Sequence, residues 1–495
     1  MLLSRAHTRY FVAGLCTLGP WVGSPLPTQA TTPVIERIDI IGSERTAAKI
    51  IRRELLFAEG EVVDSTALTE TARNLRRLSY IGEVDIRVSE DGVVAVAVED
   101  LYSRALGPVI AGHIDELTLG VTALDYNLCG RGQSLRIAAQ NSAISGFWTD
   151  VHFAEPRLGA TRHALTAQIG LGTEGHAHSL ALSRPFATLA DRRAYGLSLA
   201  TGKSLRRLYA GGALRHKYFD ARNAGRLWLA RSYGDTIKLR PSLHLNFSHR
   251  RFAPATDYTY APANRNRITL STGLLIWRPA YRRDRYIHDL GPLEDMQTGS
   301  WLALRWGFAH SALGSDRTYS FYQIHLAPRW EPSRRSYGLV TLFANTRLDG
   351  RGIYNLYALG SAALYVRVGR SHSAAVRLSW EALHRSEDAA QLLLGLERGL
   401  RGFGPRHFDG TRRLRLNIEA RPTLYRHAWY TLAAALFIDS GTAWSPASSR
   451  AELAHTPGAG LRIGFPKFYN TPLLRGDIAI GGGQVHFSVG MGQYF

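Results

Sequence analysis

The sequence predicts a mostly β protein, in which a small α+β domain precedes a transmembrane antiparallel β-barrel of about sixteen strands. The clearest observation is the alternation in residues 414–421, where even positions carry Leu, Leu, Ile and Ala, and odd positions carry Arg, Asn, Glu and Arg. Successive side chains of a strand point to opposite faces, so this strand has one apolar and one charged face, like a wall between lipid and water. Similar segments, divided by polar or Gly-rich turns, continue to Phe495. After residue 30 no run of eighteen apolar residues occurs, which argues against a membrane-spanning helix.

Residues 1–30 have the features of a secretory signal peptide. Arg5 and Arg9 supply a basic start, residues 10–18 form a short apolar stretch, and Ala30 closes a small-residue cleavage site. Cleavage removes these two arginines and no acid, so the net charge falls from +20 to +18. A buried N-terminal helix is the alternative, which Gly19, Pro20, Pro25 and Pro27 oppose. We therefore expect the bacterial outer membrane, with the small domain in the periplasm.

Two compositional features are consistent with an outer-membrane location. Cys16 would leave with the signal, and Cys129 alone cannot form an intrachain disulfide, so the closed hydrogen-bond ladder must supply the stability. The positive charge is almost entirely arginine, which pairs well with phosphate and carboxylate. In an outer membrane those anions are lipopolysaccharide phosphates and acidic lumen residues; an arginine-biased genome is the plainer alternative. Export argues against nucleic acid as a partner.

The small domain is predicted at residues 33–100 from its periodicity. Asp91-Gly92 between two apolar runs marks a hairpin, and the preceding apolar positions recur at helical spacing. The expected elements are a strand at 34–40, a helix at 46–56, a second helix capped by Asp64 or Ser65, and strands at 84–88 and 93–98. Residues 101–115 are expected to be a linker, and residues 116–495 the barrel.

This element order resembles a POTRA domain, the periplasmic module of polypeptide-transport proteins, and residues 75–84 match best. A generic α+β domain with the same order is the alternative. The resemblance implies that the domain binds unfolded polypeptide clients by adding a strand to an exposed sheet edge.

The mature chain as a whole resembles the BamA/TamA superfamily, the bacterial surface antigen family, in which POTRA domains precede a sixteen-stranded outer-membrane barrel. Each motif is short, but all occur in the family's order. They are residues 125–132 for the first hairpin, 398–403 and 408–410 for the sixth extracellular loop, 437–441 for the following strand, and 458–462 and 475–479 for the last hairpins. The single POTRA domain departs from the five of BamA and the three of TamA.

A cluster of charges is predicted inside the barrel. Alternation places Glu419 and Asp439 on the lumen side of neighbouring strands, where two carboxylates need a cation. Arg401 on the preceding loop could reach both, because its planar fork matches carboxylates, and Gly402 lets the loop fold tightly. In the family this loop plugs the barrel with its Arg-Gly-Phe tip, which Phe403 completes here. We predict that these five residues lock the loop; ordinary solvated lumen charges are the alternative.

The last strand is predicted to form a weak seam with the first. Glycines make it poor in side-chain packing, and in BamA relatives this seam is the lateral gate through which client strands leave. The terminal aromatic and the glycine at position 490 resemble the assembly signal of outer-membrane barrels, although Gln493 departs from that pattern. The expected gate residues are Leu117, Leu119, Val121, Phe487, Val489, Gly490 and Gly492, and the expected assembly signal is Gly490 with Phe495.

The sequence lacks the motifs of common enzymes. No Gly-x-Ser-x-Gly, His-Glu-x-x-His, phosphate-binding loop or paired-cysteine metal site occurs, so we expect no enzyme activity, no cofactor and no metal. The resemblance implies an outer-membrane assembly or translocation barrel that inserts or passes polypeptide clients. The alternatives are a dedicated secretion pore of the two-partner type, a lipid or lipopolysaccharide conduit, and a passive surface antigen. The expected partners are unfolded polypeptides and lipopolysaccharide or other outer-membrane lipid; the oligomeric state is left open.

Overall fold

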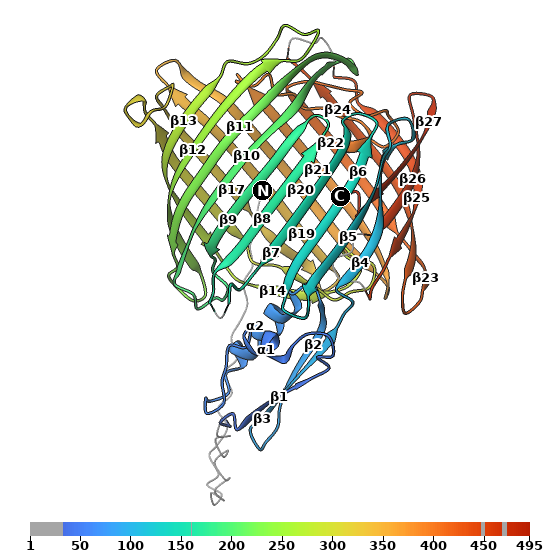
Figure 1. The fold of residues 1–495 in the computed structure, drawn as a ribbon. Coiled ribbons are helices and arrows are strands. Elements are labelled where there is room, and N and C mark those ends of the chain that lie inside the picture. The colour runs from blue at the N-terminus through green and yellow to red at the C-terminus, as the bar shows by residue number, and fades with distance from the viewer. Residues whose placement is uncertain (1–32, 160, 447–450, 468–472) are drawn as a thin grey trace, which may run out of the picture.

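A computed structural model describes residues 33–159, 161–446, 451–467 and 473–495, and the mostly β prediction is confirmed. A closed antiparallel barrel stands above a small α+β domain that lies under one of its open ends (Figure 1). The predicted signal peptide, with Cys16, lies outside the described residues.

The small domain is a three-stranded sheet covered by two helices. The strands run in the order β1-β3-β2, with β1 parallel to β3 and β2 antiparallel to it. Asp64 caps the second helix by accepting a 2.8 Å hydrogen bond from the Thr66 amide. Ile51, Leu75 and Ile81 are fully buried in the core between helices and sheet. The elements are β1 (Arg37–Ile41), α1 (Ala48–Arg52), α2 (Ser65–Arg76), β2 (Ile81–Val88) and β3 (Val93–Asp100), so α1 is shorter than the predicted 46–56.

The barrel contains twenty strands among the described residues. Two of them are interrupted once, because β17 and β18 both pair with β19, and β22 and β23 both pair with β24. In chain order the strands are β4 (Arg104–His113), β5 (Thr118–Leu128), β6 (Gln133–Ser142), β7 (Gly146–Glu155), β8 (Ala164–Gly172), β9 (Gly175–Arg184), β10 (Arg193–Ala210), β11 (Ala213–Arg231), β12 (Lys238–Pro254), β13 (Arg265–Trp277), β16 (Trp301–Ala309), β17 (Tyr319–Ala327) with β18 (Arg329–Ser333), β19 (Ser336–Asp349), β20 (Gly352–Val368), β21 (His372–His384), β22 (Arg412–Arg421) with β23 (Thr423–Arg426), β24 (Thr431–Trp444), β25 (Ala454–Gly464), β26 (Leu474–Gly481) and β27 (Gln484–Met491).

Shorter elements occupy four of the connections. A hairpin of β14 (Tyr281–Asp284) and β15 (Glu294–Gln297) joins β13 to β16 at the end of the barrel that faces the small domain. Single 3-10 turns follow β4, β16 and β21, namely η1 (Ile114–Glu116), η2 (Ser311–Leu313) and η3 (Leu396–Arg398). No described helix is both long and apolar enough to cross a membrane.

The predicted strand count of about sixteen is wrong for two physical reasons. The expected linker 101–115 contains a barrel strand, β4, so the barrel begins at Arg104 and not at residue 116. Several connections are also shorter than a typical alternation of short and long loops provides. Gly211 and Gly212 alone join β10 to β11, and both adopt the positive φ that such two-residue hairpin turns require.

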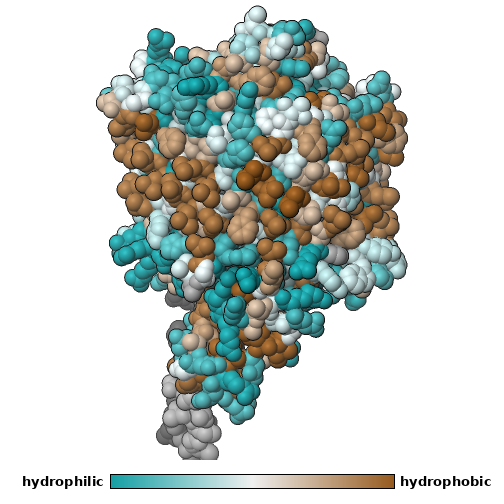
Figure 2. Space-filling view, in the orientation of Figure 1, coloured by the Kyte–Doolittle hydropathy of each residue, from teal (hydrophilic) through white to brown (hydrophobic). Residues whose placement is uncertain are grey.

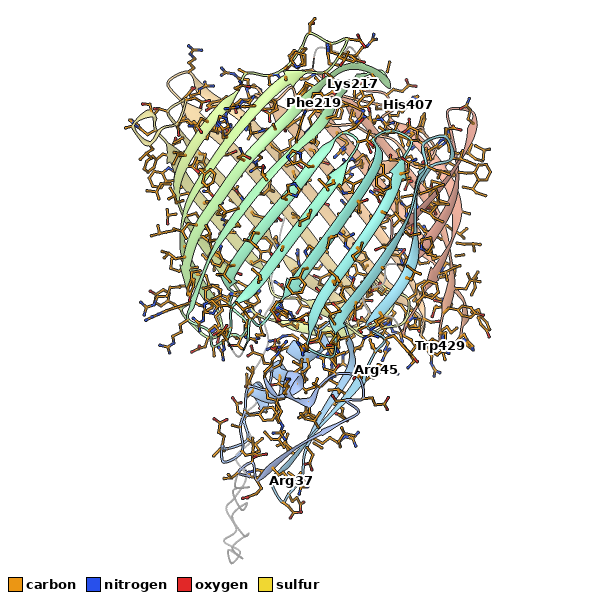
Figure 3. All side chains as sticks on the ribbon, in the orientation of Figure 1. Arg37, Arg45, Lys217, Phe219, His407 and Trp429 are labelled. Atoms are coloured by element: carbon orange, nitrogen blue, oxygen red, sulfur yellow. The ribbon has the colours of Figure 1, made fainter. Side chains whose placement is uncertain are left out.

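The wall of the barrel alternates as the sequence predicts. On β24 the side chains of Leu436 and Ile438 are 56% and 50% exposed outward, whereas Phe437 and Asp439 between and beside them are buried inside. Figure 2 shows the result as a belt of hydrophobic residues between two hydrophilic ends of the barrel. A closed ladder with an exposed apolar belt is the architecture of a transmembrane β-barrel. Trp429, labelled in Figure 3, is among the exposed aromatic residues at the end facing the small domain.

Candidate functional site

The connection between β21 and β22, residues 385–411, folds back into the barrel and is called here the inner loop. Its two arms pair where Leu394 and Phe408 exchange backbone hydrogen bonds of 2.8 and 2.9 Å. Leu394 and Leu400 are fully buried, and Phe403 and Phe408 pack against them. The tip of the loop is therefore a small apolar core held inside the lumen.

Arg401 at this tip bridges the two carboxylates that the sequence singled out. Its Nε and Nη2 donate to Asp439 Oδ2 and Oδ1 at 2.8 and 2.9 Å, and its Nη1 donates to Glu419 Oε2 at 2.8 Å. The Arg401 amide also donates to Asp439, at 3.2 Å. All three side chains are fully buried. The structure thus brings the predicted Arg401, Glu419 and Asp439 together in one bidentate network.

The network is larger than the sequence predicted. Asp477 on β26 lies 3.8 Å from Arg401 and accepts from Arg462 at 2.7 Å and from Arg475 at 2.8 Å. Arg421 donates to Glu419 at 2.8 Å. Four guanidinium groups thus surround three carboxylates, and this balance makes burial of so many charges tolerable. Alternation on β26, where Ile478 and Ile480 are exposed outward, was the available signal that Asp477 faces the lumen.

Gly402 and Phe403 hold the loop against the wall. A side chain at Gly402 would place its Cβ 2.7 Å from the Ile480 carbonyl and from Thr456, so only glycine allows this approach. The Phe403 ring meets Phe408 edge-on at 5.3 Å between centroids. Both residues therefore take part in the predicted lock. Gly402 lets the loop backbone approach the barrel wall, and Phe403 packs in the apolar core of the loop tip.

The end of the chain closes over the same cluster. Arg401 is sandwiched between the Phe437 and Tyr494 rings, at 3.3 and 4.2 Å from their centroids. Tyr494 Oη donates to the Leu396 carbonyl and accepts from the Gly399 amide at 3.1 Å. The tail beyond the last strand therefore holds the inner loop through a ring contact with Arg401 and two hydrogen bonds to the loop backbone.

This arrangement corrects the predicted C-terminal strand. β27 ends at Met491, and Gly492, with φ of +78°, turns the chain inward. The Phe495 carbonyl accepts from Arg421 at 3.0 Å, and its ring packs against the lumen cluster that includes Ile287. Gly490 lies in β27 as expected, but Phe495 of the predicted assembly signal lies in the lumen and not in the last strand.

A second anchor, at the root of the inner loop, was missed by the sequence reasoning. Glu387 accepts from Arg267 at 2.6 Å and pairs with Arg347, and Asp388 pairs with Arg250 at 2.7 Å and with Arg265. Burial opposes ionisation of Glu387, but Arg347 and Arg267 outweigh it and hold the pKa of this carboxyl below its ordinary value. The anchor is therefore fully formed at neutral pH and weakens only in acid, when Glu387 takes up a proton.

The barrel closes through a very short contact between its first and last strands. β27 pairs with β26 along its whole length, yet it pairs with β4 only at Ser488↔His113 and Val489↔Gly112. Figure 1 shows the blue β4 and the red β27 meeting at this seam. An apolar groove of about 660 Å³ runs over the seam on the outer face. It is lined by residues that include Ile110, Ile114, Leu117, Leu436, Phe487 and Val489.

Only some of the predicted gate residues lie at the seam between β4 and β27. Phe487, Val489 and Gly490 lie on β27 at the seam, whereas Gly492 follows the strand. Leu119 and Val121 face outward on β5, which is the second strand and has no contact with β27 in the ladder. The prediction failed for them because β4 lies between, although Leu117 still lines the groove.

The small domain is fixed to the near rim of the barrel by ion pairs. Arg157 on the β7–β8 loop donates to Glu54 at 2.7 Å, and Arg76 on α2 donates to Asp295 in the β14–β15 hairpin at 2.7 Å. Glu70 accepts from the Leu189 amide at 2.7 Å, on a third connection. The predicted first hairpin also touches the domain, since Asn127 donates to Thr46 at 2.8 Å and a Cβ at Gly130 or Gly132 would collide with it. These contacts hold the domain across the barrel mouth.

Removing the docking pairs is expected to release the domain from the rim. In Glu54→Ala/Arg76→Ala, Arg157 and Asp295 lose their partners while only 12% and 15% exposed, and breaking such a pair costs about 3 kcal/mol. Hydrogen–deuterium exchange in purified protein should rise in α2 and in the β14–β15 hairpin. Arg37→Ala is the matched control, because its pair with Asp39 is exposed at the far end of the domain (Figure 3). Unchanged exchange in the double variant would show that packing, and not charge, holds the domain.

Comparison with known proteins identifies the small domain. Residues 33–99 match the family model of POTRA, described as the surface antigen variable number repeat. No curated protein sequence matches the chain. Among solved structures, BamA from Haemophilus ducreyi lacking POTRA domains 1–3 is 12% identical, with 93% of this chain and 84% of that chain covered and a TM-score of 0.40. CdiB from Escherichia coli is 13% identical, with 94% and 77% covered and a TM-score of 0.47.

A POTRA domain joined to a closed barrel with an apolar belt defines the class: a POTRA-containing outer-membrane β-barrel protein. The match confirms the POTRA prediction for the small domain, residues 33–99.

Proposed function

We propose that the protein is an outer-membrane barrel that handles polypeptides. It receives unfolded client chains through its POTRA domain in the periplasm and inserts them into the outer membrane, or passes them across it. The single observation that carries the proposal is the seam of two residue pairs beside an apolar groove, because an open seam would offer a client strand both unpaired backbone and lipid. The proposal assigns no catalytic reaction, cofactor or metal to the chain.

A groove on the POTRA domain supports client binding. It has a volume of about 560 Å³ and runs between α2 and β2, one of the two edge strands of the sheet. Leu68, Ala72, Val84 and Ile86 line it, and the β14–β15 hairpin forms its far wall. An extended peptide could add to the β2 edge by main-chain hydrogen bonds while apolar side chains enter this groove. The groove ends beside the barrel rim, so a client bound there lies close to the barrel.

Insertion is favoured over passage through the lumen. The inner loop lies inside the lumen and is anchored at both root and tip, and the POTRA domain lies across the near mouth. A route through the lumen requires both obstacles to move, whereas a route through the seam requires two residue pairs to part. The dedicated secretion pore of the two-partner type is the second candidate, and a lipid conduit or passive surface antigen the third.

Deletion of the gene separates these candidates. Outer-membrane and secreted proteins are quantified by mass spectrometry in the deletion strain and in the strain complemented with the wild-type chain. A broad fall in other barrels, restored on complementation, is the expected result for insertion. Loss of one secreted protein would instead support the dedicated pore. An unchanged protein content would overturn the polypeptide role and favour lipid transport or a passive surface antigen.

A further inference from the structure

A group of cationic and hydroxyl side chains lies on the lumen wall away from the inner-loop lock. Arg226, His244 and Arg305 come from β11, β12 and β16, and all face the lumen, because their neighbours Leu227, Leu243 and Leu304 are exposed on the outer surface. Strand β13 lies between β12 and β16 and contributes Ser271. The four strands are consecutive in the barrel, so these side chains form one patch.

The hydrogen bonds of this patch leave donors in excess. Arg226 Nη2 lies 2.9 Å from His244 Nδ1, and since a guanidinium only donates, Nδ1 accepts and the imidazole is neutral. His244 Nε2 then donates to Ser242 Oγ, also at 2.9 Å. Arg305 Nε donates to Ser271 Oγ at 3.0 Å, and its Nη2 is buried with no hydrogen-bond partner in the described part of the chain. Both hydroxyl protons and most guanidinium protons therefore remain free to donate.

The patch also lacks a counter-charge. Among the described residues, no carboxylate lies within 4 Å of Arg226 or Arg305, and these two side chains repel each other. Two other lumen arginines on β12 and β13 are paired with carboxylates. Arg250 pairs with Asp220 and Asp388, and Arg267 pairs with Glu387. The patch is accessible to lumen water, since Arg226 is exposed and Arg305 half-buried. Two positive charges with several donors and no carboxylate beside them are suited to an anion with several oxygens.

We propose that Arg226 and Arg305, with Ser242 and Ser271, bind a phosphate group in the barrel lumen. A phosphate presents three or more oxygens, which two guanidinium forks and two hydroxyls from four strands can meet from different sides, whereas a carboxylate has only two. Neutral His244 orients Arg226 and is a positioning residue. The group is either free inorganic phosphate or the phosphorylated headgroup of an outer-membrane lipid. The proposal does not depend on the polypeptide role.

Binding of inorganic phosphate to the purified full chain in detergent tests the site. Isothermal titration should show saturable binding to the wild type and at least about tenfold weaker binding to Arg226→Gln/Arg305→Gln. Arg222→Gln is the matched control, because Arg222 is an exposed arginine on the same face of β11 and lies outside the patch. Its binding should equal that of the wild type. Ser271→Ala keeps both charges and should weaken binding severalfold, which preserves the test if the double variant fails to fold.

A second arm identifies the source of the phosphate. Lipid extracted from the purified wild type and variants is analysed by mass spectrometry for phosphorylated species. A phosphorylated lipid that copurifies with the wild type and with Arg222→Gln, but is depleted in the double variant and in Ser271→Ala, would assign a headgroup. Saturable inorganic phosphate without such a lipid would assign the free anion. The site is overturned if the wild type holds neither, or if the double variant and Ser271→Ala hold as much as Arg222→Gln does.

Discussion

Arg401→Ala is expected to free the tip of the inner loop and to lower the free energy of unfolding by about 3–5 kcal/mol. The truncation leaves Glu419 and Asp439 buried without the cation that binds both, and Asp477 keeps only Arg462 and Arg475. It also removes the cation between the Phe437 and Tyr494 rings, so the chain terminus keeps only the hydrogen bonds of Tyr494 to Leu396 and Gly399 as its contacts with the loop tip. The loss is large because the side chains of Glu419 and Asp439 are fully buried and water cannot replace the lost guanidinium.

Limited chymotrypsin digestion of the purified protein measures this release. Phe403 and Phe408 are the expected cleavage sites, and they are protected in the wild type by the apolar core of the tip. Cleavage there should accelerate in Arg401→Ala, while the root near Glu387 stays protected because Arg267 and Arg347 still hold it. Arg401→Lys should be intermediate, since it keeps the charge and loses the bidentate fork.

Arg398→Ala is the control for this experiment, because Arg398 is an exposed arginine of the same loop and its contact with Arg415 uses the backbone carbonyl. Its digestion pattern and stability should match the wild type. If Arg401→Ala were also digested like the wild type, the cluster would be an incidental group of lumen charges, and the apolar core of the tip alone would hold the loop.

How far the sequence predicts this site depends on the range of each interaction. Alternation along one strand is local, so the inward direction of Glu419 and Asp439 could be deduced from their neighbours. The choice of partner is not local: Tyr494 contacts Gly399 of the loop across 95 residues of sequence, and Glu387 of the loop contacts Arg347 and Arg267 across 40 and 120 residues. Nothing in their immediate neighbourhood distinguishes them from other loop or tail residues. Only the resemblance to a plugged barrel directed attention to Arg401.

The fold shows the same division between local and distant information. The period of two identifies a membrane barrel, because lipid on one side and water on the other act on every strand separately. The strand count fails at β4, where Gly107, Pro108 and Gly112 interrupt the pattern and suggest a linker. A proline is tolerated where one side of a strand is unpaired. β4 meets that condition, since β5 pairs with it along one side while β27 reaches only Gly112 and His113 on the other. Gly107, Pro108 and Gly112 therefore made β4 resemble a linker in the sequence, and the same residues suit a strand that is unpaired along most of one side.

Closing this seam with a disulfide is the prediction with the second large effect. His113→Cys and Ser488→Cys stand opposite each other in the ladder, so their Cα atoms lie within the range that a disulfide spans. When oxidised, the pair should abolish the rescue of the deletion strain, and reduction should restore it, because a covalent bond replaces the two residue pairs that must part. Cys129→Ser removes the exposed native cysteine from this background.

The matched control places the same bond elsewhere in the ladder. Thr122→Cys and Ala138→Cys stand opposite each other on β5 and β6, which pair along nearly their whole length and have no reason to separate. Oxidation there should leave rescue intact. Full rescue by the oxidised seam pair would mean that clients do not use the seam, and the route would then have to run through the lumen. That route requires the Arg401 lock and the docked POTRA domain to open, so Arg401→Ala and Glu54→Ala/Arg76→Ala would then increase transport. In a protein that works through its seam, the same variants would chiefly weaken the barrel.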